Sequence, residues 1–199
     1  MKRIGNLYEK FYSKENLILA DQKARKGKRN QKGVKIFDQD KDAYLDKLHL
    51  MLKNKEYKTS AYTTFKIREP KERIIFRLPY FPDRIVHHAA MNQLEDMFVS
   101  TFTADTYSCI KGKGIKAASD ALDKALVDVE GTQYCLKIDI KKFYPNINHD
   151  ILKKLSRKKI KDKEFLELLD GTIDSAGGLP IGNFLSQFFA NFYLTYFDH

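Results

Sequence analysis

Helical spacing of apolar residues dominates this chain. It predicts one or two short helices in residues 1 to about 20, and amphipathic helices over about 38–57, 82–98 and 115–127. Asn148 and Asp162 are typical N-caps for two further helices. A final helix follows Gly177–Gly182, a segment that we interpret as a flexible connection. This helix has the strongest apolar period of the chain, which indicates mainly core packing. Its apolar positions are Phe184, Leu185, Phe188, Phe189, Phe192, Tyr193, Tyr196 and Phe197.

Two β-rich runs, Tyr62–Arg68 and Arg73–Leu78, flank the turn-like residues 69–72 and predict a hairpin. The hairpin is strongly basic, and its side chains could hold phosphate oxygens, because Arg makes paired hydrogen bonds and Lys supplies a point charge. The same charges would also prevent an exposed hairpin from pairing with another chain, which is the simpler interpretation of this segment alone. The cations are Lys66, Arg68, Lys71, Arg73 and Arg77.

The residues Leu136–Pro145 place one carboxylate, Asp139, in an alternating apolar run that predicts a strand. An ionised carboxylate in apolar surroundings is costly unless it is paired or bound to a metal. Mg²⁺ prefers a few hard oxygen ligands together with substrate phosphates, so Asp139 is a candidate magnesium ligand. The alternative is an edge-strand carboxylate that is solvated or paired with Lys137 or Lys141. This segment alone leaves both interpretations open.

Charge and composition favour a polyanionic partner. The chain has 36 basic and 26 acidic residues and a formal net charge of +10, which favours nucleic acid first and an anionic membrane surface second. With 199 residues, 43% of them apolar, it is large enough for a packed core, so a wholly disordered protein is excluded. No apolar run reaches the length of a membrane span and no apolar signal core follows the N-terminus, so we expect a cytoplasmic protein.

Basic residues concentrate in two segments of the chain. Lys23–Lys35 contains no acidic residue, and we interpret it as a loop or frayed helix end that lies along phosphates, with Lys26, Lys28 and Arg29 as candidate nucleic-acid contacts. The alternative is an ordinary solvated run of charges. The second concentration lies in and after the helix that Asn148 begins.

Histidine and cysteine residues do not show metal-binding spacing. His87 and His88 are adjacent in a predicted helix and therefore point in different directions, which favours packing in a core or groove over chelation. Cys109 and Cys135 lack the paired spacing of a zinc site, so we expect both to be reduced and to act as small apolar residues.

A glycine-containing turn precedes the helix predicted at 115–127. Gly112 and Gly114 alternate with Lys111 and Lys113, but the full spacing of a phosphate-binding loop is missing. We therefore expect a tight turn, and its two lysines are candidate nucleic-acid contacts.

In combination and in this order, these parts resemble the fingers and early palm of a reverse transcriptase. The catalytic-strand motif is Lys-Ile-Asp-Ile-Lys-Lys-Phe-Tyr-Pro-Asn-Ile at residues 137–147. The fingers motif is Lys71–Arg77 followed by Asp83–Val86, and Tyr107–Gly114 comes next. The resemblance covers about residues 60–199, and the order and spacing of the motifs are much more specific than any single motif.

The resemblance implies a role for each matching residue in magnesium-dependent nucleotidyl transfer. It implies that Asp139 binds Mg²⁺, with the backbone carbonyl of Ile140 beside it. Tyr144 would pack under the sugar of the incoming nucleotide and reject a 2′-hydroxyl. Lys71 and Arg73 would hold the triphosphate, and Arg77 is a weaker candidate for the same role.

The motif Leu179–Gln187 favours one subgroup of reverse transcriptases. Most members have Gln at the place of Ile181 and Pro at the place of Gln187, whereas the residues found here resemble the enzymes of diversity-generating retroelements, which copy a template RNA with frequent errors at adenines. The resemblance implies that Ile181, Gly182 and Gln187 border the base pair being formed. An apolar Ile181 cannot give the directional hydrogen bond of an amide, so we expect error-prone copying.

The resemblance also implies partners and missing parts. The family carries a Tyr-x-Asp-Asp strand after the Phe-rich helix, whereas this sequence ends at His199 before reaching such a motif. We therefore expect a fragment that is inactive alone, because two of three metal carboxylates and the thumb are absent. The expected partners of the intact enzyme are template RNA, primer or cDNA, deoxynucleoside triphosphates and, in some members, a small basic accessory protein.

The expected fold is helix-rich α+β, with a basic helical extension at 1–58, fingers at 59–132 and a partial antiparallel palm sheet at 133–199. The Asp139 strand would have an exposed edge, which favours dimers through sheet addition. A basic RNA-binding module without chemistry, or a degenerate polymerase remnant, is the alternative function. A magnesium-dependent nuclease is less favoured, because Asp150 and Asp174 are better explained as helix-end residues.

Overall fold

The computed structural model describes residues 3–68 and 71–199. It is helix-rich with one two-stranded antiparallel sheet among these residues, which confirms the α+β class. The α-helices described are α1 (Tyr8–Tyr12), α2 (Lys14–Ala24), α3 (Lys32–Phe37), α4 (Lys41–Lys53), α5 (Ile85–Thr101), α6 (Ile115–Leu126), α7 (His149–Lys159), α8 (Lys163–Ile173) and α9 (Phe184–Asp198). The strands are β1 (Thr63–Ile67) and β2 (Arg73–Arg77), and the short helical turns are η1 (Asp38–Asp40), η2 (Tyr80–Arg84) and η3 (Tyr144–Asn146).

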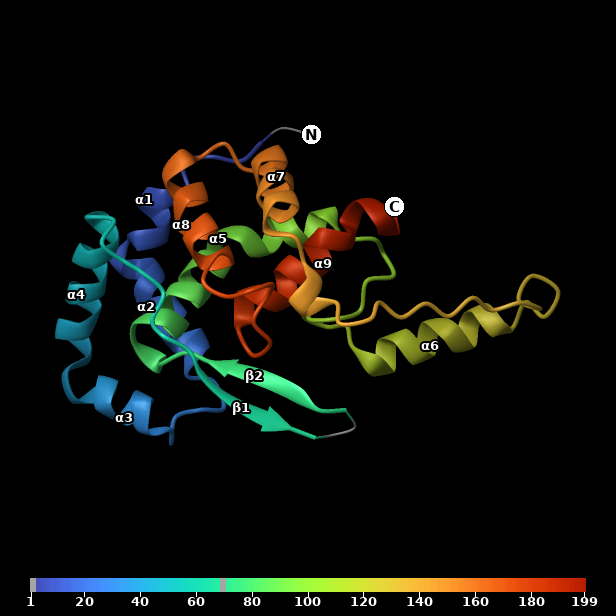
Figure 1. Ribbon diagram of the computed structural model, residues 1–199, viewed down its shortest axis with the longest axis horizontal. Helices are drawn as coiled ribbons and strands as arrows, with labels where there is room; N and C mark the ends of the chain where they lie inside the picture. Colours follow the sequence, from blue (N-terminus) through green and yellow to red (C-terminus); the bar gives the residue numbers. More distant parts are fainter. Residues whose placement is uncertain (1–2, 69–70) are drawn as a thin grey trace.

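Helix α5 runs through the middle of the helical body, where it packs against α1, α2 and α9 (Figure 1). The Phe98 ring of α5 contacts the rings of Phe188 and Phe192 on α9, with centroid separations of 6.1 and 5.1 Å. Such aromatic pairs add to the free energy gained from apolar burial. The predicted core role of the last helix is therefore confirmed near its start, whereas Tyr196 and Phe197 near its end are exposed.

Side-chain caps begin α7 and α8 as the sequence predicts. The Asn148 side chain accepts a hydrogen bond from the Ile151 N–H at 3.0 Å, and Asp162 accepts one from the Phe165 N–H at 3.1 Å. The second Asp162 oxygen accepts a hydrogen bond from the Leu7 N–H at 2.6 Å. One carboxylate therefore starts α8 and also attaches the N-terminal segment to it.

Asp21 of α2 is a fully buried carboxylate with several partners. Arg25 and Lys41 form ion pairs with it at 2.7 and 2.9 Å, and the Tyr80 hydroxyl donates to it at 2.5 Å. Burial by itself would raise the pKa of Asp21, but hydrogen bonds from these three side chains outweigh burial and lower it. This cluster joins α2 to α4 and to the turn that precedes α5.

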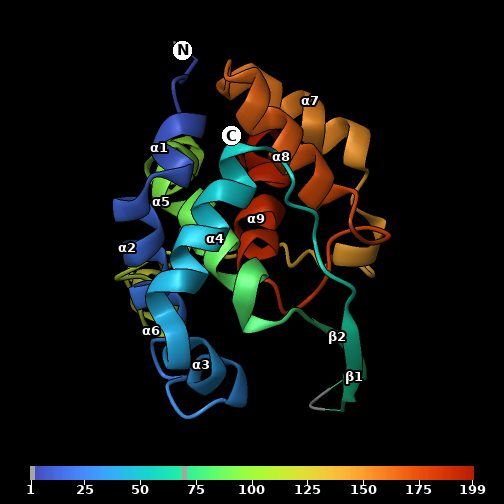
Figure 2. The same ribbon diagram turned by 90° about the vertical axis from the view of Figure 1, so that its left-hand side faces the viewer.

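The predicted hairpin forms at one end of the helical body, opposite α7 (Figure 2). Thr63 pairs with Arg77 at its base, and Ile67 pairs with Arg73 beside the turn. The predicted turn residues 69 and 70 lie outside the described residues. The expected helix start at Pro82 lies in the helical turn η2, which leads directly into α5 at Ile85. Phe81, just before the proline, has extended φ and ψ of −106° and 134°, which interrupts the helical turn there.

Helix α6 and the chain that follows it project from the body as an arm (Figure 1). The strand predicted around Asp139 does not form. Residues 134–140 are extended, but within the described chain they make no backbone hydrogen bond to another segment. Leu136 and Ile138 are 84% and 63% exposed. A strand needs a paired neighbour, and β1 and β2 pair with each other elsewhere, so the expected palm sheet and its edge are absent from the described residues.

Candidate functional site

Residues 177–183 form a loop that joins two segments with predicted nucleotide contacts. At one end of the loop, the Leu179 N–H donates to the Tyr144 carbonyl oxygen at 2.9 Å. At the other end, the Phe76 N–H of β2 donates to the Ile181 carbonyl oxygen at 2.8 Å. The loop therefore holds the hairpin and the turn η3 in fixed positions relative to each other.

Two glycines allow this close packing. Gly178 has φ of +70°, and a Cβ there would lie 2.5 Å from the Pro145 carbonyl oxygen. Gly182 has φ of +114°, and a Cβ there would lie 2.7 Å from the Phe76 carbonyl oxygen. Other residues rarely adopt such φ values. The connection is non-helical as predicted, and both ends of the loop pack closely against neighbouring backbone.

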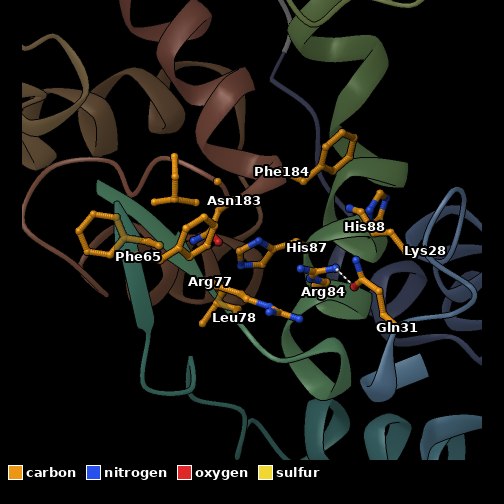
Figure 3. Close-up of a pocket in the computed structure, with 13 residues that line it drawn as sticks. Lys28, Gln31, Phe65, Arg77, Leu78, Arg84, His87, His88, Asn183 and Phe184 are labelled. Carbon is orange, nitrogen blue, oxygen red and sulfur yellow. Dashed lines mark hydrogen bonds between the residues drawn. The ribbon is translucent and has the colours of Figure 1, made fainter. Parts of the chain in front are cut away.

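A pocket of about 280 Å³ lies where the loop meets the hairpin (Figure 3). Its walls come from four separate segments, namely the basic segment before α3, the hairpin, the start of α5 and the loop. Three of the predicted contact residues meet here, Lys28, Arg77 and Gly182. The full lining is Lys28, Gln31, Phe65, Ile75, Phe76, Arg77, Leu78, Arg84, His87, His88, Gly182, Asn183 and Phe184.

Positive charge concentrates in the pocket. Burial, and then the nearby charge of Arg77, lowers the pKa of Arg84, while burial and then Arg84 lower the pKa of Lys28. Arg84 donates a hydrogen bond to the Gln31 side-chain oxygen at 3.1 Å. Within residues 3–68 and 71–199, none of these three cations belongs to an ion pair. Grouped cations without acidic partners attract phosphate.

Arg84, His87 and His88 are pocket residues that the sequence analysis did not assign to the site. His87 and His88 follow Arg84 by three and four residues, the spacing at which helical side chains neighbour each other, and this is the signal that could have identified them. His87 is 3% exposed, and its Nε2 atom has no hydrogen-bond partner among the described residues. The His88 ring stacks on Phe184 with a centroid separation of 4.3 Å. The predicted packing of both histidines in a core or groove is confirmed.

Acidification should reduce the stability of the folded chain. Burial lowers the pKa of both His87 and His88 from the ordinary 6.5 to about 4, and Asp83 only partly opposes this for His87. Between these pH values the unfolded chain binds protons that the folded chain does not, so stability is complete above pH 6.5 and is lost as the pH falls toward 4. His87 alone should cost about 2 kcal/mol between pH 7.5 and pH 5.

Urea denaturation at several pH values measures this effect, with His87→Gln as the comparison. The buried carboxylate Asp21 does not interfere, because its lowered pKa affects stability only as the pH falls through and below its ordinary value of 3.8. The variant should show a flatter dependence of unfolding free energy on pH. Equal slopes for the variant and the parent chain would contradict a neutral, buried His87.

Tyr144 and the exposed hairpin cations lie outside the pocket. Tyr144 begins η3 and is half-buried beside Phe143. Burial raises the pKa of its phenol, Cys109 adds to this effect, and Arg73 opposes it, so Arg73 is near enough to act on the phenol electrostatically. Lys71 is exposed close to the turn of the hairpin. Two of the five predicted hairpin cations, Lys66 and Arg68, instead form ion pairs with Glu72 at 2.9 and 3.5 Å.

The described residues do not form a complete magnesium site around Asp139. Asp139 and Ile140 lie in the exposed extended segment of the arm, and neither lines the pocket. The described residues contain no group of three or more His, Cys, Asp or Glu side chains that could hold a metal. A single carboxylate supplies fewer oxygens than Mg²⁺ binds. The predicted alternative pairing with Lys137 or Lys141 is also not observed in the described part of the chain.

The other predicted nucleic-acid contacts are distributed over the surface. Lys26 and Arg29 are exposed in the turns between α2 and α3, beside Lys28. The basic segment Lys23–Lys35, which we interpret from the sequence as a loop or frayed helix end, begins with the last residues of α2 and ends within α3. Lys111 and Lys113 lie in the turn before α6, and Lys113 donates to the Ala104 carbonyl oxygen at 2.5 Å. These two lysines do not line the pocket.

Three further sequence predictions can be compared directly with the structure. The tight turn predicted at Gly112 and Gly114 is confirmed, since both have positive φ values of 79° and 151°. Gln187 is exposed on α9 and does not line the pocket. Cys109 and Cys135 are free, as predicted, but both are exposed and therefore do not act as core residues.

Asp150 and Asp174 occupy helix ends, as the sequence predicts. Asp150 lies in the first turn of α7, and Asp174 follows the last residue of α8. Asp174 pairs with Lys153 at 2.5 Å and contacts His149 at 3.2 Å. Among the described residues, neither carboxylate belongs to a group of three or more possible metal ligands, which the less favoured nuclease would need.

Comparison with known proteins finds one distant relative and no family match. No protein-family model matches the chain. Protein YkfC of Escherichia coli (strain K12) is 25% identical over an alignment of 134 residues that covers 61% of this chain and 35% of YkfC. The aligned part of the chain thus corresponds to about a third of that relative's length. Among the helices of the described residues, none has the length and apolar character needed to cross a membrane.

Proposed function

We propose that this chain is the fingers and part of the palm of an RNA-directed DNA polymerase, which copies a template RNA into cDNA by magnesium-dependent nucleotidyl transfer. The convergence of the hairpin, the start of α5 and the Gly182 loop on one cationic pocket carries this proposal. The Gly182 loop is far from the hairpin and from α5 in the sequence, and the motif resemblance gives several residues of these segments contacts with nucleotide. Their meeting in space is what such a site requires.

The arrangement of cations suits phosphoryl transfer, in which positioning and charge neutralisation supply most of the catalysis. In this proposal Lys71 and Arg73 hold the triphosphate of the incoming deoxynucleotide at the outer part of the hairpin. Tyr144, which is electrostatically coupled to Arg73, contacts the sugar. Asp139 provides one metal ligand of the complete enzyme, and Mg²⁺ supplies charge stabilisation to the phosphates when it is bound.

A primer-extension assay tests the proposed activity. The full-length protein is incubated with a primed RNA template, deoxynucleoside triphosphates and Mg²⁺, and extended DNA is measured. We expect extension that requires the RNA template and stops when EDTA is added. Reactions with no template and with no protein are the controls. RNA binding without any extension would overturn the polymerase proposal.

A basic RNA-binding module without chemistry is the second candidate function. The exposed position of Asp139 favours it, because the described residues contain no group of three or more His, Cys, Asp or Glu side chains that could hold a metal. The charge of the chain and the cationic pocket fit such a module equally well. The same assay separates the two functions, since the module would bind the template but incorporate no nucleotide.

The copying accuracy of the proposed enzyme should depend on Ile181. Its side chain is half-buried, whereas its carbonyl oxygen holds the hairpin, so a side-chain substitution leaves that hydrogen bond available. Ile181→Gln should lower misincorporation at template adenines severalfold, because an amide restores directional hydrogen bonding. Sequencing of the cDNA products measures the error spectrum. Ile181→Leu is the matched control, and equal error spectra for Ile181→Gln and the parent enzyme would argue against this role.

A further inference from the structure

The arm that α6 and the following chain form is strongly apolar on its surface. Helix α6 contains no buried residue, and Ile115 at its start is 92% exposed. The exposed large apolar side chains of the arm are Ile115, Leu122, Leu126, Val127, Val129, Tyr134, Leu136, Ile138 and Ile140. Soluble monomers rarely expose a contiguous apolar patch of more than a few hundred square ångströms. The arm, which projects from the body in Figure 1, therefore has the character of an interaction surface.

The backbone of the arm is also unpaired. Residues 134–140 are extended, and within the described chain their N–H and C=O groups make no hydrogen bond to other backbone. A row of such groups is a template for pairing with another strand. In a strand, the apolar residues 136, 138 and 140 would share one face, and Lys137 and Asp139 would share the other. The segment has the pattern of a strand and lacks a neighbour.

The charge of the arm argues against nucleic acid or an anionic membrane as this neighbour. Residues 115–130 contain two basic and four acidic side chains, a net charge of −2, although the whole chain carries +10. A polyanion would be repelled by this part of the arm. Residues 134–140 instead carry one cation and one anion, Lys137 and Asp139, and neither has an ion pair within residues 3–68 and 71–199. Such a segment is complementary in charge to a second copy of itself.

An antiparallel pairing of two copies about a two-fold axis at Ile138 satisfies every side chain of the segment. Lys137 of each copy then lies opposite Asp139 of the other copy, which gives two pairs of opposite charge. Leu136 lies opposite Ile140 on the apolar face. An axis at residue 137 or 139 would place two like charges opposite each other, and an axis between residues would mix apolar and charged side chains on one face. The sequence therefore favours a single register.

We propose that two copies of this chain associate through residues 136–140 as a pair of antiparallel strands, and that α6 of each copy covers the apolar face of the pair. A sheet with one apolar face buries that face against another element. Helix α6 offers an apolar stripe whose members follow one another by seven, four and three residues. The stripe consists of Ile115, Leu122, Leu126 and Val129. The same surface is used by both copies, so the assembly closes as a dimer.

Sedimentation equilibrium of the 199-residue chain at several concentrations tests this dimer. We expect an equilibrium between monomer and dimer. Lys137→Asp should weaken dimerisation at least about tenfold, because two pairs of opposite charge become two pairs of like charge. The substitution also lowers the net charge of the chain by two, from +10 to +8, which by itself would favour association. A weaker dimer therefore cannot result from general charge repulsion.

Exchange of the two charges is the decisive variant. Lys137→Asp combined with Asp139→Lys restores both opposite-charge pairs, so its dissociation constant should return to within about threefold of that of the parent chain. Lys154→Asp, at an exposed position on α7, is the matched control and should change the dissociation constant less than about twofold. Lys137 and Asp139 are exposed, so thermal melting should show that all variants are folded.

Two results would overturn the dimer. One is a dimer that Lys137→Asp weakens and the charge exchange does not restore, because the register then is not the one proposed. The other is a monomer at every concentration. Hydrogen exchange of residues 136–140 would then show whether the chain itself covers the segment, which also rejects a second copy as its neighbour.

The dimer does not rest on the proposed function, and the two can fail separately. Sedimentation requires neither template nor nucleotide. The charge-exchanged variant moves the carboxylate from position 139 to position 137, so it should dimerise but fail in the primer-extension assay. Primer extension by a protein that remains monomeric would reject the dimer and retain the enzyme, whereas a dimer in a protein without extension would do the reverse.

Discussion

Gly178→Ala should destabilise the folded chain by about 4 kcal/mol. The residue has φ of +70°, which costs a side-chain-bearing residue about 1–3 kcal/mol. The added Cβ would also lie 2.5 Å from the Pro145 carbonyl oxygen and 2.6 Å from the Tyr144 carbonyl oxygen, so backbone would have to shift. Such overpacking costs about another 1–3 kcal/mol. Urea denaturation would report the loss as a lower midpoint of unfolding.

Gly177→Ala is the matched control, one residue earlier in the same loop. A Cβ at Gly177 would have no heavy atom within 4 Å, and φ there is not positive. The free energy of unfolding should therefore change by less than about 1 kcal/mol. Similar stabilities for the two variants would show that the loop is not held against η3 as the structure shows. Gly178→Ala should also reduce RNA binding at the pocket, since the loop supplies Gly182 and Asn183.

Asp139→Ala should abolish primer extension by the full-length protein while leaving its fold intact. We expect a loss of about a thousandfold or more, because a catalytic metal contributes several kcal/mol of charge stabilisation and each 1.4 kcal/mol corresponds to about tenfold in rate. The side chain is exposed and has no ion pair within the described chain, so its removal should change the melting temperature little. Activity and thermal melting are measured on the same preparation.

Asp123→Ala provides the control on the same arm. Asp123 is an exposed carboxylate of α6, outside the catalytic-strand motif. Its removal changes the charge of the arm by the same amount, and it should leave primer extension within about twofold, since exposed charges far from a site act weakly. Equal losses for the two variants would indicate a general effect of charge on RNA binding. Full activity of Asp139→Ala would contradict the proposed metal-binding role.

Local interactions explain which structural predictions were correct. Asn148 and Asp162 were identifiable as caps because each side chain accepts a hydrogen bond from the backbone N–H three residues later. Such a contact depends on the adjacent sequence. The hairpin was predictable from its two β-rich runs and the turn between them. The strand at Asp139 was wrong for the opposite reason. Its alternating pattern shows which residues suit a strand, but a strand forms only where a neighbour completes its hydrogen bonds, and none of the described segments does so.

The candidate site was predictable only in part. Lys28, Arg77 and Gly182 were chosen from charge and motif, and all three line the pocket. His87 was assigned to packing, since a sequence cannot show that one buried nitrogen lacks a partner or that a cavity lies beside it. Gln187 was placed at the site by motif, but the direction of α9 leaves it outside the pocket.

By itself, the sequence determined the helix-rich composition, the caps, the basic hairpin and the net charge of +10, because these depend on residue type and short-range spacing. Only the tertiary structure decided that residues from four separate segments enclose one cationic pocket, and that Asp139 lies apart from it on an exposed arm. The physical reason is that long-range packing depends on how whole elements fit together. Here it required the Phe76 to Ile181 hydrogen bond and two glycines that tolerate close backbone contact.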